Sequence, residues 1–345
     1  MGTLAVVGSG AWGTALACHA ARLGHSVTMW AHEPEVVEEI DTCHTNSLYL
    51  PDISLPAGIR AFSDAAEVVS SAEVVILVPP SKHLRSVSGL LAGAVAPEAV
   101  VVVASKGIEE ESLKLMSEVL AETMPDLDEQ RLAFLSGPSF AREVAQGLPT
   151  DVVLGSREML AAQVVQPMLH SPVFRVYSSP DPVGVQVGGA VKNVAAVAAG
   201  ACDGLSFGTN ARAALITRAL AEITRLGVAL GAEPLTFLGL AGVGDLVLTC
   251  TGDLSRNRTL GKQIAEGVDP KQYLAGRRSV AEGFFTSAAA YHLSLELNVD
   301  MPITDHVFHV LHRGRPLLEA VRLLLSREFK EELQGMGRDP APRAG

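Results

Sequence analysis

The stretch Gly8-Ser9-Gly10-Ala11-Trp12-Gly13 decides the fold of the first half of this chain. It follows the apolar run Leu4-Ala5-Val6-Val7 and precedes residues 14–23, whose apolar spacing is typical of a helix. A G-x-G-x-x-G turn between a strand and a helix is the fingerprint of dinucleotide binding. Gly8 makes the tight turn, Gly10 lets the backbone approach a pyrophosphate, and Gly13 lets helix and strand pack closely. The sequence therefore predicts a cofactor site at the helix start, where free N–H groups attract phosphate.

Strand and helix patterns alternate from this turn to about residue 181, and then the strand patterns end. Continuous apolar strands joined by helical crossovers indicate a mainly parallel sheet covered on both faces. Beyond Pro182, long segments rich in Ala, Leu and Val carry apolar residues at helical spacing. We therefore predict an α/β chain, with a doubly wound N-terminal Rossmann domain followed by an all-α domain. Strands are expected at 4–7, 27–30, 74–78, 100–104, 133–136, 152–154 and 174–177, and the later helices at 183–202, 212–226, 233–240, 256–266, 287–297 and 316–325.

The segment Ser178-Ser179-Pro180-Asp181-Pro182 has the composition of a domain boundary. We predict a dinucleotide-binding domain at residues 1–181 and a substrate-binding and catalytic domain at 182–334. Residues 335–345 are rich in Gly, Pro and Arg, which predicts a disordered tail.

Composition excludes several classes of function. The chain has 345 residues and a formal net charge of -11, which argues against a sequence-independent nucleic-acid binder. The apolar run at 191–202 is interrupted by Lys192 and Asn193, so it predicts a buried helix and not membrane insertion. No signal peptide is apparent, and the four cysteines form no CxxC pair. A reducing cytoplasm is therefore the expected location.

The choice between NAD and NADP depends on the tip of the second strand, which reads Met29-Trp30-Ala31-His32-Glu33. An acidic residue at this tip binds the ribose hydroxyls and repels a 2′-phosphate, whereas a cation favours the phosphate. His32 is expected at the tip with Glu33 just beyond it. The sequence leaves the cofactor preference open.

A second concentration of polar chemistry runs from Gly239-Leu240-Ala241-Gly242-Val243-Gly244-Asp245 through Thr249 to Ser255-Arg256-Asn257. A dianionic phosphate monoester needs a permanent cation with fork geometry and neutral donors for its remaining oxygens. Arg256 with Ser255 and Asn257 supplies this set at an expected helix start. The pattern predicts a phosphate site; a solvated helix start is the alternative.

Reduction of a ketone by hydride leaves an alkoxide, which needs a proton donor beside it. The candidates are Lys106, at the carboxyl end of an expected strand, and Lys192, in a helix otherwise built of Val, Ala and Gly. An ammonium in such a helix must face a cleft, pair with an acid or titrate, and Asp245 is its expected partner. A buried structural ion pair is the alternative. The turn at 136–141 is open between a ligand contact and a plain strand-to-helix connection.

Three histidines, His306, His309 and His312, follow one another at intervals of three residues. These positions sweep too far round a helix for all three rings to meet one ion. We therefore interpret them as surface histidines and expect no metal site.

Four segments, at residues 136–141, 184–193, 210–218 and 239–257, carry a resemblance to a known family. Over residues 4–325 the chain resembles the bacterial NAD(P)-dependent glycerol-3-phosphate dehydrogenase family, soluble enzymes that reduce dihydroxyacetone phosphate for phospholipid synthesis. The resemblance implies a Rossmann domain joined to a helical domain, NAD(P)H as cofactor and a small-molecule substrate.

The resemblance also implies roles for single residues. Lys192 matches the family's proton acceptor, which donates the proton in the reductive direction, and Asp245 and Lys106 complete the expected catalytic group. The substrate contacts it implies are Lys106, Gly137, Ser139, Lys192, Asp245, Ser255, Arg256 and Asn257. The cofactor contacts are Gly8, Gly10, Ala11, Trp12, Gly13, His32, Lys106, Ala141, Arg256, Val280 and Glu282.

The chain departs from the family pattern at four positions. Ala11 stands where members often carry a hydroxyl, Trp12 where they carry Tyr or Phe, His32 where Arg is frequent, and Ala281 where valine is expected. Two other classes remain as alternatives, a dehydrogenase of β-hydroxyacids and a non-catalytic redox sensor. The Ala-rich helical faces leave a homodimer open.

Overall fold

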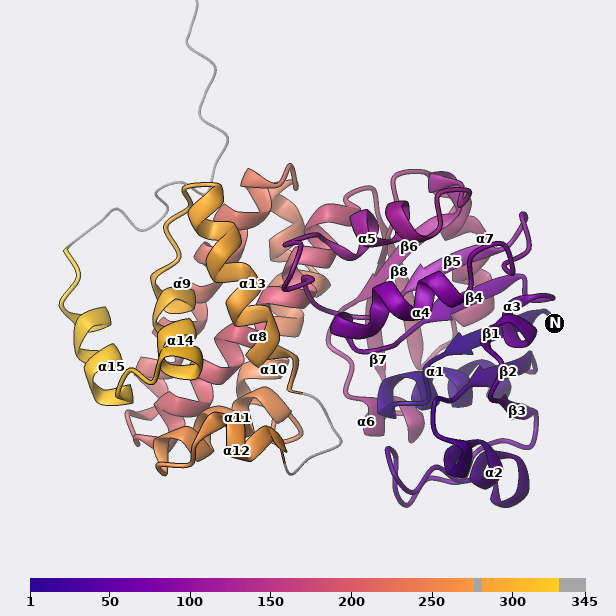
Figure 1. Cartoon of the computed structure of the whole chain (residues 1–345), viewed down its shortest axis with the longest axis horizontal. Coiled ribbons are helices and arrows are strands. Elements are labelled where there is room, and N and C mark those ends of the chain that lie inside the picture. The colour runs from indigo at the N-terminus through magenta and orange to yellow at the C-terminus, as the bar shows by residue number, and fades with distance from the viewer. Residues whose placement is uncertain (276–280, 329–345) are drawn as a thin grey trace, which may run out of the picture. The chain divides into compact units, whose positions relative to one another are not determined.

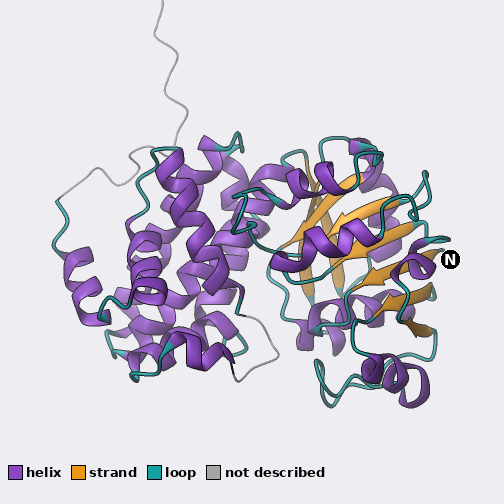
Figure 2. Ribbon diagram, in the orientation of Figure 1, coloured by secondary structure: helices purple, strands orange, loops and turns teal. Residues whose placement is uncertain are grey.

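The computed structural model describes residues 1–275 and 281–328, which form two compact units. The first comprises residues 1–106 and 114–186, and the second comprises 107–113 with the described residues from 187 onward. The division falls inside one helix, α8 (Pro182–Gly204), between Gln186 and Val187. Figure 2 shows strands in the first unit and helices joined by loops in the second, as predicted from the sequence. The predicted tail at 335–345 and Val280 lie outside the described residues.

An eight-stranded sheet forms the centre of the first unit, in the order β3-β2-β1-β4-β5-β6-β7-β8 (Figure 1). Every neighbouring pair is parallel except β6 and β7, which confirms the predicted mainly parallel sheet. Its strands are β1 (Thr3–Val7), β2 (Ser26–Trp30), β3 (Ile59–Phe62), β4 (Val74–Leu77), β5 (Val100–Val103), β6 (Leu132–Ser136), β7 (Thr150–Gly155) and β8 (Phe174–Ser179).

The edge strand β3 is absent from the sequence prediction. Its four residues alternate, with Ile59 and Ala61 buried and Arg60 exposed. Asp41 holds the strand from outside, because its carboxylate accepts hydrogen bonds from the Ala61 N–H (2.8 Å) and from Arg60 Nη2 (3.2 Å). A run this short forms a strand only where a neighbour such as β2 offers its backbone.

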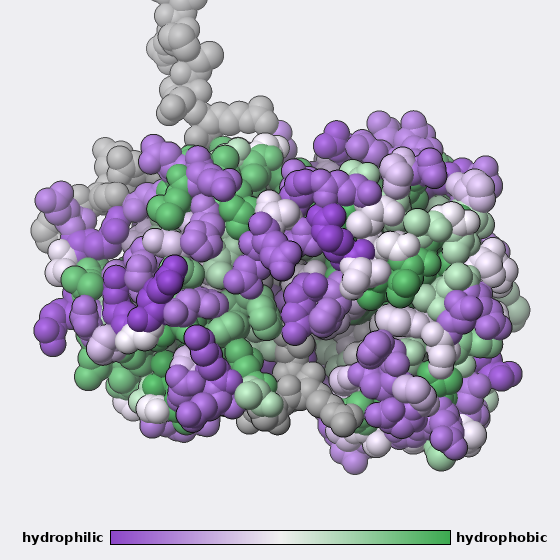
Figure 3. All heavy atoms as spheres, in the orientation of Figure 1, coloured by the Kyte–Doolittle hydropathy of each residue, from purple (hydrophilic) through white to green (hydrophobic). Residues whose placement is uncertain are grey.

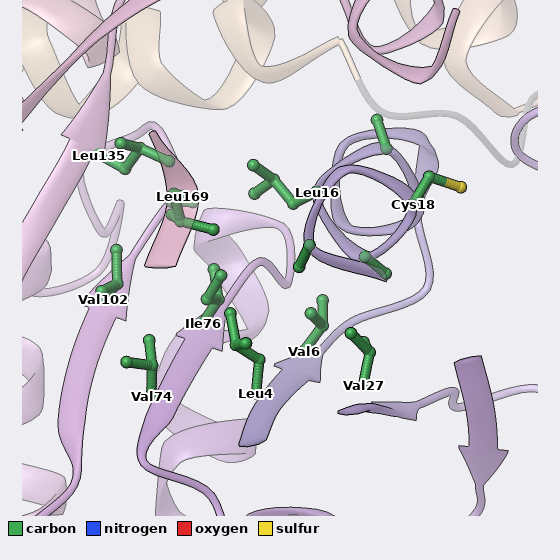
Figure 4. Close-up of a cluster of buried hydrophobic side chains, with 14 of the residues drawn as sticks. Leu4, Val6, Leu16, Cys18, Val27, Val74, Ile76, Val102, Leu135 and Leu169 are labelled. Carbon is green, nitrogen blue, oxygen red and sulfur yellow. The ribbon is translucent and has the colours of Figure 1, made fainter. Parts of the chain in front are cut away.

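Apolar side chains fill the space between the sheet and the helices that cover one face (Figure 4). Leu4, Val6, Val74, Ile76 and Val102 rise from three adjacent strands toward Leu16 and Leu169 on α1 and α7. Alternate residues such as Val75 and Val101 point to the other face and are also fully buried. The first-unit helices are α1 (Ala11–Arg22), α2 (Pro34–Cys43), α3 (Ala65–Val69), η1 (Ser81–His83), α4 (Leu84–Leu90), α5 (Met116–Thr123), η2 (Glu129–Arg131), α6 (Ala141–Ala145) and α7 (Met159–Leu169).

The second unit is helical in all its described elements. From α8 it continues through α9 (Gly208–Ala229), η3 (Pro234–Leu238), η4 (Leu240–Gly244), α10 (Asp245–Thr251), α11 (Arg256–Ala265), α12 (Pro270–Ala275), α13 (Glu282–Glu296), α14 (Pro302–Arg313) and α15 (Leu317–Leu325). Two kinds of prediction need correction. The expected helix at 233–240 is a short 3₁₀ turn that ends at Leu238, and α10, α12 and α14 were not among the expected helices.

Helix α8 is long and apolar enough to cross a membrane by length and composition alone, but 94% of its apolar window is buried inside the protein. Its residues from 185 to 201 are almost all buried, and a helix that is buried on every side is apolar all round. On the face shown in Figure 3, hydrophilic side chains lie among hydrophobic ones over both units.

Candidate active site

The glycine turn after β1 has the geometry that its fingerprint predicts. Gly8 has φ +120°, and a Cβ there would lie 3.0 Å from the carbonyl carbon of Val78. A Cβ on Gly13 would lie 2.0 Å from the Gly8 carbonyl oxygen. Both positions therefore require glycine, one for its backbone conformation and one for close packing of helix and strand.

Gly10 differs, because a Cβ there would meet no atom within 4 Å. It is the N-cap of α1, with no side-chain cap and no acidic residue in the first turn. The first N–H groups of a helix have no partner within it. Trp12 Nε1 is buried without a hydrogen-bond partner among the described residues. Open space, free N–H groups and an unsatisfied donor fit an anionic dinucleotide.

The tip of β2 presents both cationic and acidic groups. His32 is exposed, and its ring lies edge-on to Trp30 at 6.1 Å between centroids. The pKa of His83 is lowered by burial and by the nearby charges of Lys82 and His32. Glu33 Oε1 accepts a hydrogen bond of 2.6 Å from the Tyr49 hydroxyl. Sequence reasoning missed Tyr49, since it lies 16 residues beyond Glu33 with no local signal.

Lys106 and Gly137, from two neighbouring parallel strands, meet beyond the carboxyl ends of those strands. Lys106 follows β5, and its Nζ donates to the Gly137 carbonyl oxygen at 3.1 Å. Ser139 Oγ donates to the same oxygen at 2.9 Å. Gly137 has φ +122°, and a Cβ there would lie 3.0 Å from Val152 Cα, so this turn also requires glycine. Ala141 begins helix α6 directly after it.

Lys192 and Asp245 form a buried ion pair in the second unit, as the composition of α8 predicts. Lys192 Nζ donates to Asp245 Oδ1, and the two side chains keep 8% and 1% of their exposed area. Asp245 is the first residue of α10 and follows the glycine-rich turn of η4. Gly188 lets α8 approach this turn, because a Cβ there would lie 2.4 Å from the Ala241 carbonyl oxygen.

Thr249 completes this buried group; the sequence analysis placed it in the polar segment but not among the predicted site residues. Its Oγ1 accepts a hydrogen bond from Lys192 Nζ at 3.0 Å and donates to the Asp245 carbonyl oxygen at 2.7 Å. Thr249 lies one helical turn after Asp245, so the spacing of four residues was a usable signal. The ammonium thus contacts the carboxylate of Asp245 and the hydroxyl of Thr249.

Ser255 begins α11 in the way the sequence predicts. Its hydroxyl oxygen accepts the Arg258 N–H at 3.2 Å and caps the helix. The Asn257 amide donates to Asn193 Oδ1 at 2.8 Å and accepts the Gly283 N–H at 2.9 Å. Asn193 directly follows Lys192, so the start of α11 is linked to the buried ion pair; Asn193 was not among the predicted site residues.

Arg256, the first residue of α11, reaches solvent. Desolvation by surrounding atoms lowers the pKa of its guanidinium, and the nearby Glu282 carboxylate opposes this shift. Arginine stays charged throughout the physiological range. A cation and helix N–H groups therefore lie together at the start of α11, which is a suitable site for a phosphate.

The structure arranges the predicted site residues in two groups. The first unit contains the glycine turn, Lys106, Gly137, Ser139 and Ala141, and the second contains Lys192, Asp245, Ser255, Arg256, Asn257 and Glu282.

The histidines of α14 belong to neither group and are not the surface histidines that the sequence predicted. They are half-buried, and burial lowers the pKa of His312, whose Nε2 lies 3.0 Å from Ser287 Oγ. Within residues 1–275 and 281–328, no group of three His, Cys, Asp or Glu side chains could hold a metal ion.

A Rossmann unit with a dinucleotide turn, followed by a helical unit that contains a buried lysine and a cationic helix start, has the architecture of two-domain, nucleotide-dependent dehydrogenases. Comparison with known proteins identifies the family within this class. The profile of the NAD-dependent glycerol-3-phosphate dehydrogenase N-terminus matches residues 3–162, and that of the C-terminus matches residues 181–322. The chain belongs to the NAD-dependent glycerol-3-phosphate dehydrogenase family and is an oxidoreductase.

Individual relatives agree with this assignment. A glycerol-3-phosphate dehydrogenase [NAD(P)+] of Geobacter metallireducens is 49% identical over 329 residues, covering 95% of this chain and 98% of that protein. The corresponding protein of Geobacter sp. strain M21 is 50% identical with the same coverage. The crystal structure of glycerol-3-phosphate dehydrogenase from Coxiella burnetii matches with a TM-score of 0.90 and 37% identity, covering 94% of this chain and 99% of that one.

Proposed function

We propose that this enzyme catalyses reversible hydride transfer between NAD(P)H and dihydroxyacetone phosphate, giving sn-glycerol 3-phosphate for glycerophospholipid synthesis. The observation that carries the proposal is the link within one helical unit between a buried ammonium, Lys192, and a phosphate-type helix start at Arg256. A ketone that carries a phosphate needs both features, a proton donor and an anion site, at a fixed separation.

The cofactor is held by the first unit in this proposal. Gly8, Gly10 and Gly13 shape the turn, and the N–H groups of Ala11 and Trp12, at the start of α1, would hold the pyrophosphate. When bound, the dinucleotide supplies or accepts the hydride. His32, Ala141, Arg256, Val280 and Glu282 are proposed as further cofactor contacts.

The substrate phosphate is bound by Arg256, Ser255 and Asn257. The Ser255 oxygen accepts the Arg258 N–H, which leaves its own O–H free to donate to a phosphate oxygen. Lys106, Gly137 and Ser139 are proposed as further substrate contacts, with the Lys106 ammonium stabilising negative charge on the former carbonyl oxygen.

Lys192 is the proposed acid. As hydride reaches the carbonyl carbon, the C=O π electrons move to oxygen, and one N–H proton of Lys192 transfers to that oxygen to give the alcohol. Asp245 and Thr249 hold the ammonium in one orientation before the transfer. In the oxidative direction the neutral amine of Lys192 takes the hydroxyl proton back.

Three further expectations are kept as proposals. The first is that residues 1–181 form a dinucleotide-binding domain and residues 182–334 a substrate-binding and catalytic domain. A cytoplasmic location accords with four free cysteines. A homodimer accords with exposed apolar side chains of the second unit, among them Leu235, Leu238 and Leu325.

The test is steady-state oxidation of NADPH and of NADH by the purified protein, with dihydroxyacetone phosphate supplied or withheld. We expect turnover that depends on the phosphorylated ketone and is far weaker with dihydroxyacetone, which lacks the phosphate. Turnover with a β-hydroxyacid or its keto form instead, or tight cofactor binding without any turnover, would contradict the proposal.

A further inference from the structure

Asp203, near the end of α8, joins two arginines of neighbouring helices. Its Oδ2 accepts a hydrogen bond from Arg258 Nε at 2.7 Å, and its Oδ1 accepts one from Arg212 Nη1 at 2.8 Å. The Asp203 and Arg258 side chains keep 13% and 9% of their exposed area. Arg258 also donates from Nη1 to Asp253 Oδ1 at 2.8 Å. One guanidinium therefore connects α8 with both α11 and the loop before it.

Glycines bring the backbones of α8 and α11 into direct contact. A Cβ on Gly200 would lie 1.9 Å from the Arg258 carbonyl oxygen, and one on Gly261 would lie 1.9 Å from the Val197 carbonyl oxygen. Contacts of this kind set the distance between two helices. Hydrogen bonds are directional, and those between the two helices fix where α11 begins along α8.

Two such contacts are present, three helical turns apart on α8 (Figure 1 labels both helices). Asn193 binds Asn257 beside Lys192, and Asp203 binds Arg258 eleven residues beyond Lys192, about 16 Å along the helix axis. Arg256 lies two residues before Arg258 in the first turn of α11. The position of Arg256 relative to Lys192 is thus fixed by one rigid helix held at two points.

We propose that Asp203 is a positioning residue for the phosphate site: through Arg258 it holds the first turn of α11 so that Arg256 and Ser255 meet the phosphate while the carbonyl lies at Lys192. This inference rests on the proposed function. Asp203 itself binds no substrate, because both oxygens of its carboxylate are occupied by arginines.

Holding both arginines requires the negative charge and the two acceptor oxygens of the Asp203 carboxylate, and not only a side chain of the same shape. Arg258 and Arg212 present N–H donors to both Asp203 oxygens, so the amide of Asp203→Asn places an NH₂ donor against one of them. The hydrogen bond to Arg258 or to Arg212 is then lost, and the charge that holds both arginines is lost as well. The volume of the side chain stays the same.

The experiment compares wild type with Asp203→Asn by steady-state kinetics. We expect the KM for dihydroxyacetone phosphate to rise about tenfold, as for loss of one charge-assisted hydrogen bond in the phosphate site. We expect kcat to change less than about threefold. The phosphate contacts stabilise the bound substrate and the transition state equally, so their loss raises KM and leaves kcat nearly unchanged. The KM for NADPH and the kcat/KM for dihydroxyacetone, which has no phosphate, stay at wild-type values. A general loss of structure would lower all of these together.

Two further variants complete the design. Arg212→Gln removes one of the two partners of Asp203, so it should raise the same KM by a smaller factor, and it takes over the test should Asp203→Asn fail to fold. Arg225→Ala is the matched control, since this α9 arginine donates to the Asp300 carbonyl oxygen at 2.7 and 3.0 Å. It should leave the KM for dihydroxyacetone phosphate unchanged.

An unchanged KM for dihydroxyacetone phosphate in both Asp203→Asn and Arg212→Gln overturns the inference. An equal decrease in kcat/KM for dihydroxyacetone and for dihydroxyacetone phosphate also overturns it. Calorimetric titration with sn-glycerol 3-phosphate separates this failure from failure of the proposed function. A wild type that binds this ligand without turnover contradicts the function, while weaker binding by Asp203→Asn and unchanged binding by Arg225→Ala still support the role of Asp203.

Discussion

The Asp245 carboxylate accepts a hydrogen bond from the Lys192 ammonium in a place where neither side chain is more than 8% exposed. Each charge alone would be costly at this depth, and together they hold a proton donor at one fixed atom. The pair therefore has two measurable consequences, one for stability and one for turnover.

Lys192→Met should lower kcat by about 10²- to 10⁴-fold, the range for loss of a general acid, while the KM for NADPH changes little. It should also reduce the free energy of unfolding by roughly 3–5 kcal/mol, because Asp245 is left buried without its partner. Adding Asp245→Asn should restore much of the stability but no turnover. Thermal melting and kcat of both variants check this; near-normal turnover in Lys192→Met would refute the role of Lys192.

Thr249→Val keeps the shape of the side chain and removes the hydroxyl that accepts from Lys192 Nζ at 3.0 Å. We expect kcat to fall about tenfold, since a hydrogen bond to a charged group contributes roughly 1.5–3 kcal/mol. Thr249→Ser retains the hydroxyl and serves as the control, with kcat close to that of wild type. Equal kcat values for the Val and Ser variants would show that the hydroxyl does not orient the ammonium.

Gly10→Ala and Gly13→Ala should separate cofactor binding from folding. Gly10 has φ -60° and open space where a Cβ would lie, so the alanine should fold normally but raise the Kd for NADPH about tenfold or more by obstructing the pyrophosphate. Gly13→Ala places a methyl group 2.0 Å from a backbone oxygen. It should cost about 1–3 kcal/mol or more of stability. Melting curves and NADPH fluorescence titrations distinguish the two, and the reverse pattern would contradict the site.

The Tyr49→Phe variant should bind NADPH more weakly relative to NADH than the wild type does. The Tyr49 hydroxyl binds Glu33 at 2.6 Å and so reduces the negative charge that a 2′-phosphate would meet near His32. Without it, the KM for NADPH should rise about threefold to tenfold, while that for NADH stays constant. Glu33→Gln should shift the ratio of the two KM values in the opposite direction. A ratio unaffected by either change would place the 2′-phosphate away from Glu33.

The buried carboxyl group of Glu222 should make the stability of the second unit depend on pH. It is fully buried in α9 and accepts the N–H groups of Ile303 (2.6 Å) and Thr304 (3.1 Å) at the start of α14. Burial raises its pKa to about 7, against the opposing effect of these hydrogen bonds and Arg225. A carboxyl whose pKa is higher in the folded state stabilises the fold at low pH, and this contribution is lost as pH rises from 4.5 to about 7.

The difference in unfolding free energy between wild type and Glu222→Gln isolates this effect. The wild type should lose roughly 3 kcal/mol relative to the variant across that interval, as expected for a pKa raised from 4.5 to about 7. Denaturant titrations at pH 4.5, 6 and 8 measure it. Glu296→Gln, at the exposed end of α13, is the matched control and should follow the wild type. Parallel curves for wild type and Glu222→Gln would rule out titration of Glu222 in this range.

Features fixed by local sterics and by composition could be predicted from the sequence. The glycine turn is one, since the backbone conformation of Gly8 and the close packing at Gly13 admit no side chain. The burial of Lys192 is another, because an ammonium in a helix of Val, Ala and Gly needs an acid, and Asp245 is that acid. The start of α11 at Arg256, capped by Ser255, follows from its own residues.

Contacts between residues distant in sequence were decided by the tertiary structure alone. The strand β3 forms because β2 offers an edge, Tyr49 reaches Glu33 from beyond helix α2, and Asp203 binds Arg258 only because two helices touch at glycines. No periodicity or motif encodes these pairs, since each depends on where a second element is placed by the packing of the whole unit. The sequence determined which functional side chains the protein contains, while the tertiary structure decided which distant residues position those side chains.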